Sequence, residues 1–449
     1  MPVTEKSALT QYADCYCPKL EDLLVSKGKM GFWSVWAVGV GGMVGGIFPV
    51  LGLSVQLTSG GAPLAFAIAG VVVLMTTYAY AKLSVAYPSR GGTVAFLNQA
   101  FGTGLVSGSL NNLLWLSYVV MLSLYFSAFG SYAASLFAES AQSFWKHLLI
   151  SVVVVGMTGL NLRTAAVIGL AQSWIVGFKL VILLLFIALG IWGIDSQRLS
   201  PASWPDLPEL VAGGMMIFLS YEGFELIANT AEDVVNPART LPRAYYSAVV
   251  FVIWLYVFIA VVTVGNLPVE QIVAARDYAL AAAARPVMGQ LGVVLVSSAA
   301  LLSTTSAINA TFYGSARLSN VIVQSKNPPQ LLSNQVKNQH HWGLFTTSGL
   351  TLVIANIFDL SRISTMGSAG FLLLFTAVNL ANGRLYRQTQ SLRWLSLLGA
   401  FFCVTALLVL WAKTAQTDSQ TLWVMVAMVG LAFSLDLVYC LFTNSQLRL

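Results

Sequence analysis

Apolar runs of about 20 residues, nearly free of charge, follow one another along most of this 449-residue chain. A helix of about 20 apolar residues spans the hydrocarbon core of a bilayer. Only 9% of the residues are charged, whereas a soluble domain carries about 25%. The runs lack the alternating ten-residue segments of a membrane barrel, so helices must pair the backbone groups inside the lipid. The sequence therefore predicts an all-α integral membrane protein.

The runs predict twelve transmembrane helices and a definite orientation. Cytoplasmic segments attract positive charge. With the amino terminus inside, sixteen of the 23 Lys and Arg residues fall on the cytoplasmic side, six fall outside and Lys179 lies within a span. Both termini are therefore predicted to be cytoplasmic, in a multi-pass protein of the plasma (inner) membrane. The expected spans are 31–57, 62–86, 108–137, 147–162, 167–193, 209–230, 243–265, 287–320, 342–358, 364–382, 394–413 and 421–442.

The first predicted span contains five glycines and a proline between Gly39 and Pro49. Glycine costs about 1 kcal/mol in a helix interior and proline about 3 kcal/mol, so this density predicts a broken helix. Freed N–H groups at mid-membrane can hold a carboxylate, and freed carbonyls can hold an ammonium. The alternative is close helix packing through Gly41 and Gly45, which have the GxxxG spacing. Pro49 favours the break, because a packing motif does not need a proline.

The sixth predicted span carries Glu222, Gly223 and Glu225 within apolar sequence. An acid at the bilayer centre costs roughly 2.5–3.5 kcal/mol and usually faces the bundle interior. The alternative is a hydrated position near the cytoplasmic end of the span. The two interrupted spans lie five helices apart, which is typical of inverted repeats that enclose a binding site. The expected organisation is a cytoplasmic segment 1–30, a five-helix repeat 31–193, an inverted repeat 209–382 and accessory helices 394–442.

Three stretches together resemble the amino acid–polyamine–organocation (APC) transporter superfamily. They are the glycine-rich stretch 41–48, the stretch 221–244 and the weaker match 309–317, and the loop 87–92 is also similar. One departure is that Gly46 follows Gly45 directly, so Gly45 stands where the family has a small residue between two glycines. The resemblance implies a five-plus-five inverted repeat of the LeuT type with two accessory helices. It also implies secondary active transport of amino acids or related amines by alternating access.

The resemblance implies roles for individual residues in the two interrupted spans. N–H groups at Gly45, Gly46 and Ile47 would meet a substrate carboxylate. Carbonyls of Met43, Leu219 and Glu222 would receive the ammonium. Tyr221 would contact or gate the substrate, and Glu225 is assigned to gating. The segment 232–243 would be a cytoplasmic latch or, alternatively, a solvated turn. The expected substrate-binding set is Gly41, Gly42, Met43, Val44, Gly45, Gly46, Ile47, Leu219, Ser220, Tyr221, Glu222 and Gly223.

Lys179 lies inside the fifth predicted span, where a buried ammonium is costly. By resemblance, its charge replaces the sodium ion of sodium-coupled relatives and couples transport to protons, with Ser303 and Thr304 as neighbours. The alternative is a lysine whose ammonium reaches the membrane interface. The expected partners are a small-molecule amino acid, protons and the lipid bilayer. Nucleic acid is not expected, because the basic residues lie between apolar runs rather than in a cluster.

Other functions fit the sequence less well. An intramembrane enzyme needs a converging nucleophile and base or a metal cluster. His147, His340 and His341 have neither spacing, so no catalytic residue, metal or cofactor is expected. A channel would show a repeated pore element or rings of charge. A nutrient sensor on a transporter fold and a polyamine exchanger remain open, as does the choice among uniport, symport and exchange. Glu222 would favour a cationic substrate unless it is neutral or paired.

Overall fold

The structure is a computed structural model that describes residues 30–163, 168–325 and 336–442. The predicted amino-terminal segment, except for Met30, and the side chains of His340 and His341 lie outside the described part. Within these ranges, helices are the regular structure, together with one isolated bridge between Met30 and Val234. The prediction of an all-α protein is confirmed.

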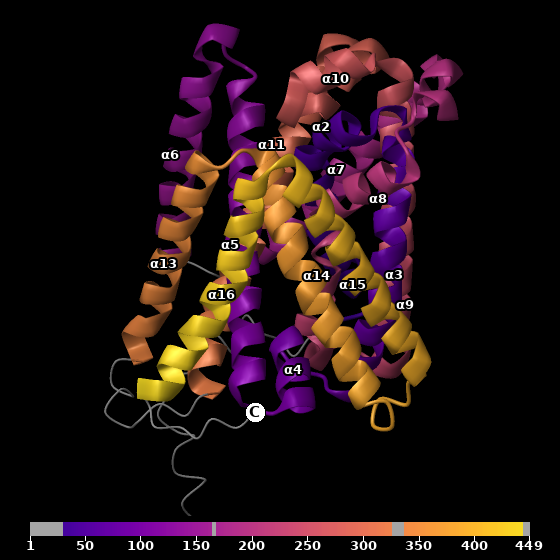
Figure 1. Ribbon diagram of the computed structural model, residues 1–449. Coiled ribbons are helices and arrows are strands. Elements are labelled where there is room, and N and C mark those ends of the chain that lie inside the picture. The colour runs from indigo at the N-terminus through magenta and orange to yellow at the C-terminus, as the bar shows by residue number, and fades with distance from the viewer. Residues whose placement is uncertain (1–29, 164–167, 326–335, 443–449) are drawn as a thin grey trace, which may run out of the picture.

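The helices follow the predicted order and form one bundle (Figure 1). The α-helices are α1 (Phe32–Met43), α2 (Ile47–Thr58), α3 (Ala62–Ala86), α4 (Thr93–Phe101), α5 (Leu105–Ala134), α6 (Gln142–Arg163), α7 (Ile168–Gly190), α8 (Leu207–Met216), α9 (Pro237–Asn266), α10 (Val269–Ala275), α11 (Ala279–Ser325), α13 (Val336–Ile357), α14 (Leu360–Arg384), α15 (Arg393–Thr417) and α16 (Ser419–Phe442). The 3-10 helices used below are η1 (Val44–Gly46), η7 (Phe218–Tyr221), η8 (Phe224–Asp233) and η9 (Arg276–Tyr278). The short helices α4 and α10 lie at opposite ends of the bundle, which we call the α4 end and the α10 end (Figure 1).

Nine stretches in the described ranges are long and apolar enough to cross a membrane, or ten if the bent pair 207–216 and 218–233 forms one span. With the bent pair counted, the number is two below the predicted twelve. The stretch Phe32–Ala86 counts once although it holds α1, α2 and α3, and the apolar part of α13 is only Gly343–Ile357. The chain turns between α2 and α3 at Ser59, whose φ is 47°.

The centre of the bundle is formed by α5 and α14, whose most apolar windows are 89% and 83% buried. By contrast, α6, α7 and α16 bury a third or less of theirs. Large apolar side chains on these outer helices are exposed, among them Val155, Trp174 and Trp423. Lipid is as apolar as these side chains, so this exposure is expected at a membrane-facing surface.

Candidate functional site

The sixth predicted span is broken at its centre. The helix α8 ends at Met216, and the axis bends by 51° into the segment 218–233. Glu222 has an extended backbone, with φ −56° and ψ 149°, and Gly223 has a left-handed φ of 112°. A Cβ at Gly223 would also lie 2.6 Å from the carbonyl carbon of Gly42. Glycine is therefore required at 223 both for the left-handed turn and for the close approach of α1.

The interruption of the first span is shallower than the sequence predicts. Residues Val44–Gly46 form a single 3-10 turn between α1 and α2, and Val44 and Gly46 keep right-handed helical angles. The expectation of an unwound segment is therefore wrong here. A 3-10 turn keeps its backbone hydrogen bonds and still accommodates glycine and the following Pro49, so the chain need not unwind.

The glycines of the first span instead allow backbone to pack on backbone. A Cβ at Gly46 would overlap the Ser220 carbonyl oxygen and lie 2.7 Å from the Ser220 Cα. A Cβ at Gly42 would lie 3.0 Å from the carbonyl oxygen of Gly223. These two glycines have the four-residue spacing of a packing motif, one position beyond the pair that the sequence suggested. The two interruptions therefore lie against each other in the interior of the bundle.

A tyrosine on α9 connects the two interruptions. The Tyr256 hydroxyl donates to the carbonyl oxygens of Met43 and of Ser220, the latter at 3.0 Å. Tyr256 is fully buried. Its hydroxyl therefore supplies the two backbone oxygens with a hydrogen-bond donor at a depth where the bilayer offers no water. The sequence alone does not single out Tyr256, because it lies in an apolar run and no local pattern distinguishes it from the other tyrosines.

Two serines of α14 satisfy the backbone groups freed where α8 ends. Ser364 Oγ donates to the Met216 carbonyl at 2.6 Å, and Ser368 Oγ donates to the same oxygen at 3.1 Å. Ser368 Oγ also accepts from the Leu219 amide at 3.0 Å. A hydroxyl can donate and accept at once, so one side chain serves both sides of the break. The signal that could have identified them is a pair of hydroxyls four residues apart in an apolar span.

The acidic pair of the sixth span is buried. Glu222 is 3% exposed and Glu225 is 1% exposed, which excludes the hydrated alternative in this conformation. Tyr118 on α5 donates to Glu225 Oε1 at 3.0 Å. Glu222 and Glu225 lie three residues apart in the same interrupted span. Glu222 Oε1, Glu225 Oε2 and Ser220 Oγ are buried without a donor among the described atoms. Two neighbouring carboxylates repel each other, and a single shared proton would satisfy both.

Lys179 on α7 is fully buried and points into the bundle. Its Nζ donates to the Gly41 carbonyl at 2.8 Å and to Ser303 Oγ on α11 at 3.2 Å. The alternative of an ammonium that reaches the membrane interface does not fit this position. Thr304 is also buried, but its hydroxyl donates to the Ala300 carbonyl of its own helix at 2.8 Å.

The remaining predicted site residues are Gly45, Tyr221, Leu219, Val44 and Ile47. A Cβ at Gly45 would lie 3.5 Å from atoms of Tyr125, Ser303 and Ala307, which is ordinary van der Waals distance. Tyr221 is directed toward α3, where its hydroxyl donates to the Phe66 carbonyl at 2.9 Å. The Leu219 carbonyl accepts from the Glu222 amide at 3.0 Å. Val44 and Ile47 are buried beside them.

Ion pairs and backbone hydrogen bonds connect the end of η8 to two other parts of the α4 end. Arg90, in the loop before α4, pairs with Glu232 at 3.4 Å and with Asp233 at 3.1 Å. The Met30 amide donates to the Asp233 carbonyl at 2.6 Å, and the Val235 amide donates to the Met30 carbonyl at 3.0 Å. The predicted latch segment therefore contacts both the start of α1 and the loop between α3 and α4.

A hollow of about 1020 Å³ lies at the α10 end, among α2, α5, α6, η9, α13 and α14. Asp277 on η9 lies at its wall and accepts from Ser131 and from Lys146, both at 2.7 Å. A Cβ at Gly52 of α2 would overlap the carbonyl oxygen of Arg276. The α10–η9 segment is therefore packed directly on α2 and tied to α5 and α6 by one carboxylate.

Removal of the Tyr256 hydroxyl should loosen the crossing of the two interruptions. A buried oxygen left without its donor costs about 1–3 kcal/mol. We expect Tyr256→Phe to lower the apparent melting temperature in detergent by several degrees. Tyr246→Phe, a change at a half-exposed tyrosine on the same helix, should leave it unchanged. Equal melting temperatures for the two variants would show that the hydroxyl does not hold the crossing.

The known proteins that resemble this chain include permeases and transporters. The family model described as amino acid permease matches residues 30–446. The inner membrane transport protein YbaT of Escherichia coli is 32% identical over 78% of this chain and 82% of its own. The branched-chain amino acid permease BcaP of Lactococcus lactis is 24% identical over 85% of this chain and 88% of its own. The methylthioribose transporter of Bacillus subtilis is 25% identical over 77% of this chain and 78% of its own.

Proposed function

The chain belongs to the amino acid permease family, and we propose that this transporter carries a zwitterionic amino acid across the membrane by alternating access. The observation that supports the proposal most is the crossing of two interrupted helices in the interior, where the Tyr256 hydroxyl bonds a backbone oxygen of each. The relatives are permeases and transporters rather than enzymes.

In the proposed site, the substrate lies on the Gly45 side of the crossing and faces Tyr125 and Ser303. Gly46 and Ser220 are in contact, so the space between them is closed in this conformation. Substrate binding would open the 3-10 turn Val44–Gly46, so that amides at residues 45–47 hold the carboxylate at the start of α2. Carbonyls of the broken sixth span would hold the ammonium. Ser220 Oγ, which is buried without a partner among the described atoms, is a further candidate ligand.

The proposed membrane arrangement has twelve spans in a five-plus-five inverted repeat with two accessory helices. A 55-residue helix would be about 80 Å long, far more than the roughly 30 Å of hydrocarbon. The turn at Ser59 supports two spans within Phe32–Ala86, and α13 would be a short ninth span. The charge distribution supports a cytoplasmic α4 end, because Arg90, Arg239 and Arg243 belong to the predicted inner set.

We also propose that proton movement drives transport through Lys179 and the acidic pair. Lys179 donates hydrogen bonds to Gly41 of α1 and to Ser303 of α11. A change in its charge would therefore act on α1 directly. Glu225 contacts Tyr118 of the central helix α5. Opening toward the cytoplasm would separate Arg90 from Glu232 and Asp233, which makes this cluster the inner latch.

Uptake into proteoliposomes tests the proposed function. The panel should contain radiolabelled leucine, alanine, serine, arginine, putrescine and methylthioribose, each with and without an inward proton gradient. We expect uptake of at least one amino acid to rise with the gradient, and we expect no competition from its decarboxylated amine. Uptake of putrescine or methylthioribose alone would contradict a site built for a zwitterion, and uptake of none would favour a sensor.

A further inference from the structure

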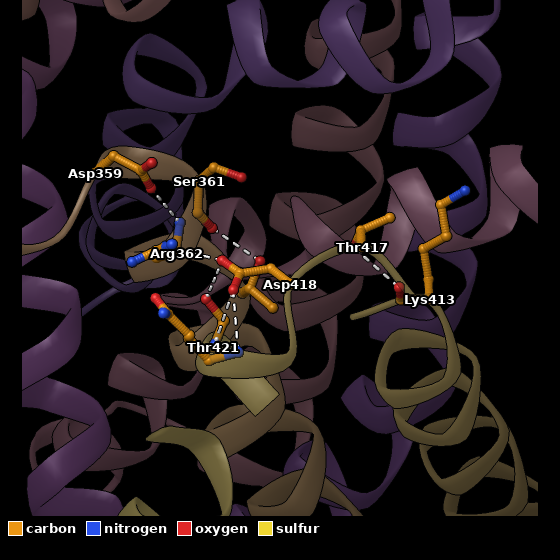
Figure 2. A network of polar contacts seen from close by, with 9 residues as sticks. Asp359, Ser361, Arg362, Lys413, Thr417, Asp418 and Thr421 are labelled. Carbon is orange, nitrogen blue, oxygen red and sulfur yellow. Dashed lines mark hydrogen bonds and ion pairs between the residues drawn. The ribbon is translucent and has the colours of Figure 1, made fainter. Parts of the chain in front are cut away.

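The connection between α15 and α16 reaches the ends of two helices of the candidate site. Asp418 Oδ2 pairs with Arg362 Nε at 2.8 Å, and Arg362 lies in the first turn of α14. Five residues before Asp418, Lys413 Nζ pairs with Glu209 Oε1 at 2.7 Å, and Glu209 lies in the first turn of α8. Figure 2 shows Asp418 between Arg362 and Thr421, with Lys413 on the neighbouring end of α15.

Asp418 directly precedes α16, and the first residues of that helix hold its carboxylate in place independently of Arg362. It accepts from the amides of Gln420 and Thr421 at 3.1 and 3.2 Å, and from the Thr421 hydroxyl at 2.7 Å. The Thr421 hydroxyl contributes most to the lowered pKa of this carboxyl, followed by the Thr421 amide and Arg362. Asp359 likewise accepts from the Arg362 amide at 2.9 Å. An ordinary surface ion pair contributes little to stability, because ordering its two side chains costs entropy. Here the carboxylate is already ordered.

The end of α8 at the break is fixed to α14, the helix that carries Arg362. Ser364 and Ser368 of α14 both donate to the Met216 carbonyl at the last residue of α8. A contact between α8 and α14 therefore lies at the break, and two ion pairs to the α15–α16 hairpin lie at the α10 end. The helix α8, only ten residues long, is therefore joined to α14 directly at the break and through the α15–α16 hairpin at its other end.

We propose that the α15–α16 hairpin is a brace that keeps α8 and α14 together as one rigid unit throughout the transport cycle. This inference rests on the proposed transport function. The helices that open the α10 end would then be α2 and the α10–η9 segment, which move relative to the unit. The two ion pairs stay closed in every state, whereas the inner latch opens once in each cycle.

Crosslinking separates a brace from a gate. In a chain whose four cysteines are replaced by serine, we would introduce the pair Glu209→Cys and Lys413→Cys and join it with a bifunctional methanethiosulfonate reagent. Uptake of the substrate found in the panel should stay within twofold of the unlinked protein. The matched control joins Arg90→Cys to Asp233→Cys at the inner latch, where crosslinking should lower uptake at least tenfold and reduction should restore it.

A loss of uptake at the brace equal to that at the latch would overturn the inference. A second measurement does not need transport. In Asp418→Asn combined with Lys413→Met, amide hydrogen exchange in residues 207–216 should be at least tenfold faster than in the unchanged chain. Unchanged exchange would also overturn the brace. A different result is that the parent chain takes up no compound of the panel while the double variant still shows the expected faster exchange. That result would count against the proposed function alone.

Discussion

Gly46→Ala is expected to lower substrate uptake at least tenfold, whereas Gly45→Ala should lower it less. A Cβ at Gly46 would overlap the backbone of Ser220, which cannot rotate away as a side chain can. Overpacking of this kind costs about 1–3 kcal/mol, and each 1.4 kcal/mol corresponds to about tenfold. A Cβ at Gly45 meets its neighbours at 3.5 Å. Alanine there also restores the small residue of the family pattern.

The two glycine variants are compared at equal amounts of folded protein. The measurement is the initial rate of uptake into proteoliposomes, normalised to the monodisperse fraction in size-exclusion chromatography. Because the two positions are adjacent, any general effect of a methyl group on helix α1–α2 should appear in both. If Gly46→Ala transports as well as Gly45→Ala, the two interruptions do not need to touch for function.

Lys179→Ala is expected to abolish uptake driven by a proton gradient, with a loss of at least tenfold. The change removes two hydrogen bonds from a fully buried site and leaves the Gly41 carbonyl and Ser303 Oγ without their donor. Hydrogen bonds to charged groups contribute about 1.5–3 kcal/mol each. The gradient would then have no charge to act on next to α1.

Lys82→Ala is the matched control, since this lysine also donates to a backbone carbonyl, that of Gln390, but at an exposed position. It should keep both the rate and the gradient dependence of uptake. The measurement is uptake with and without an imposed pH difference at constant membrane potential. Gradient-driven uptake that persists in Lys179→Ala would refute the coupling role, even if the overall rate falls.

The helical fold was predictable because lipid leaves few choices for a chain of long apolar runs. The second predicted span, 62–86, coincides with α3 (Ala62–Ala86). Helix ends were less predictable, because α6, α13 and α14 extend several residues beyond their apolar parts. The helices α4 and α10 were missed, since segments of nine and seven residues are too short for a search by apolar runs.

The sequence located both interruptions of the candidate site but not their shapes. Gly223 next to Glu222 indicated a break that the structure has, whereas the glycines before Pro49 indicated unwinding that the structure replaces with a 3-10 turn. Local propensity cannot tell unwinding from close packing, because the answer depends on Ser220, far away in the sequence. Tyr256 was invisible for the same reason: its importance comes from what it contacts rather than from its neighbours along the chain.

We propose that the transported amino acid is held by the backbone where the two interruptions cross. The most direct measurement is a cryo-electron microscopy map of the protein with its transported amino acid bound. We predict density beside Gly45, with the carboxylate at the amides of residues 45–47 and the ammonium at carbonyls of residues 219–222. Density found only in the hollow at the α10 end, with the crossing unchanged, would contradict the claim.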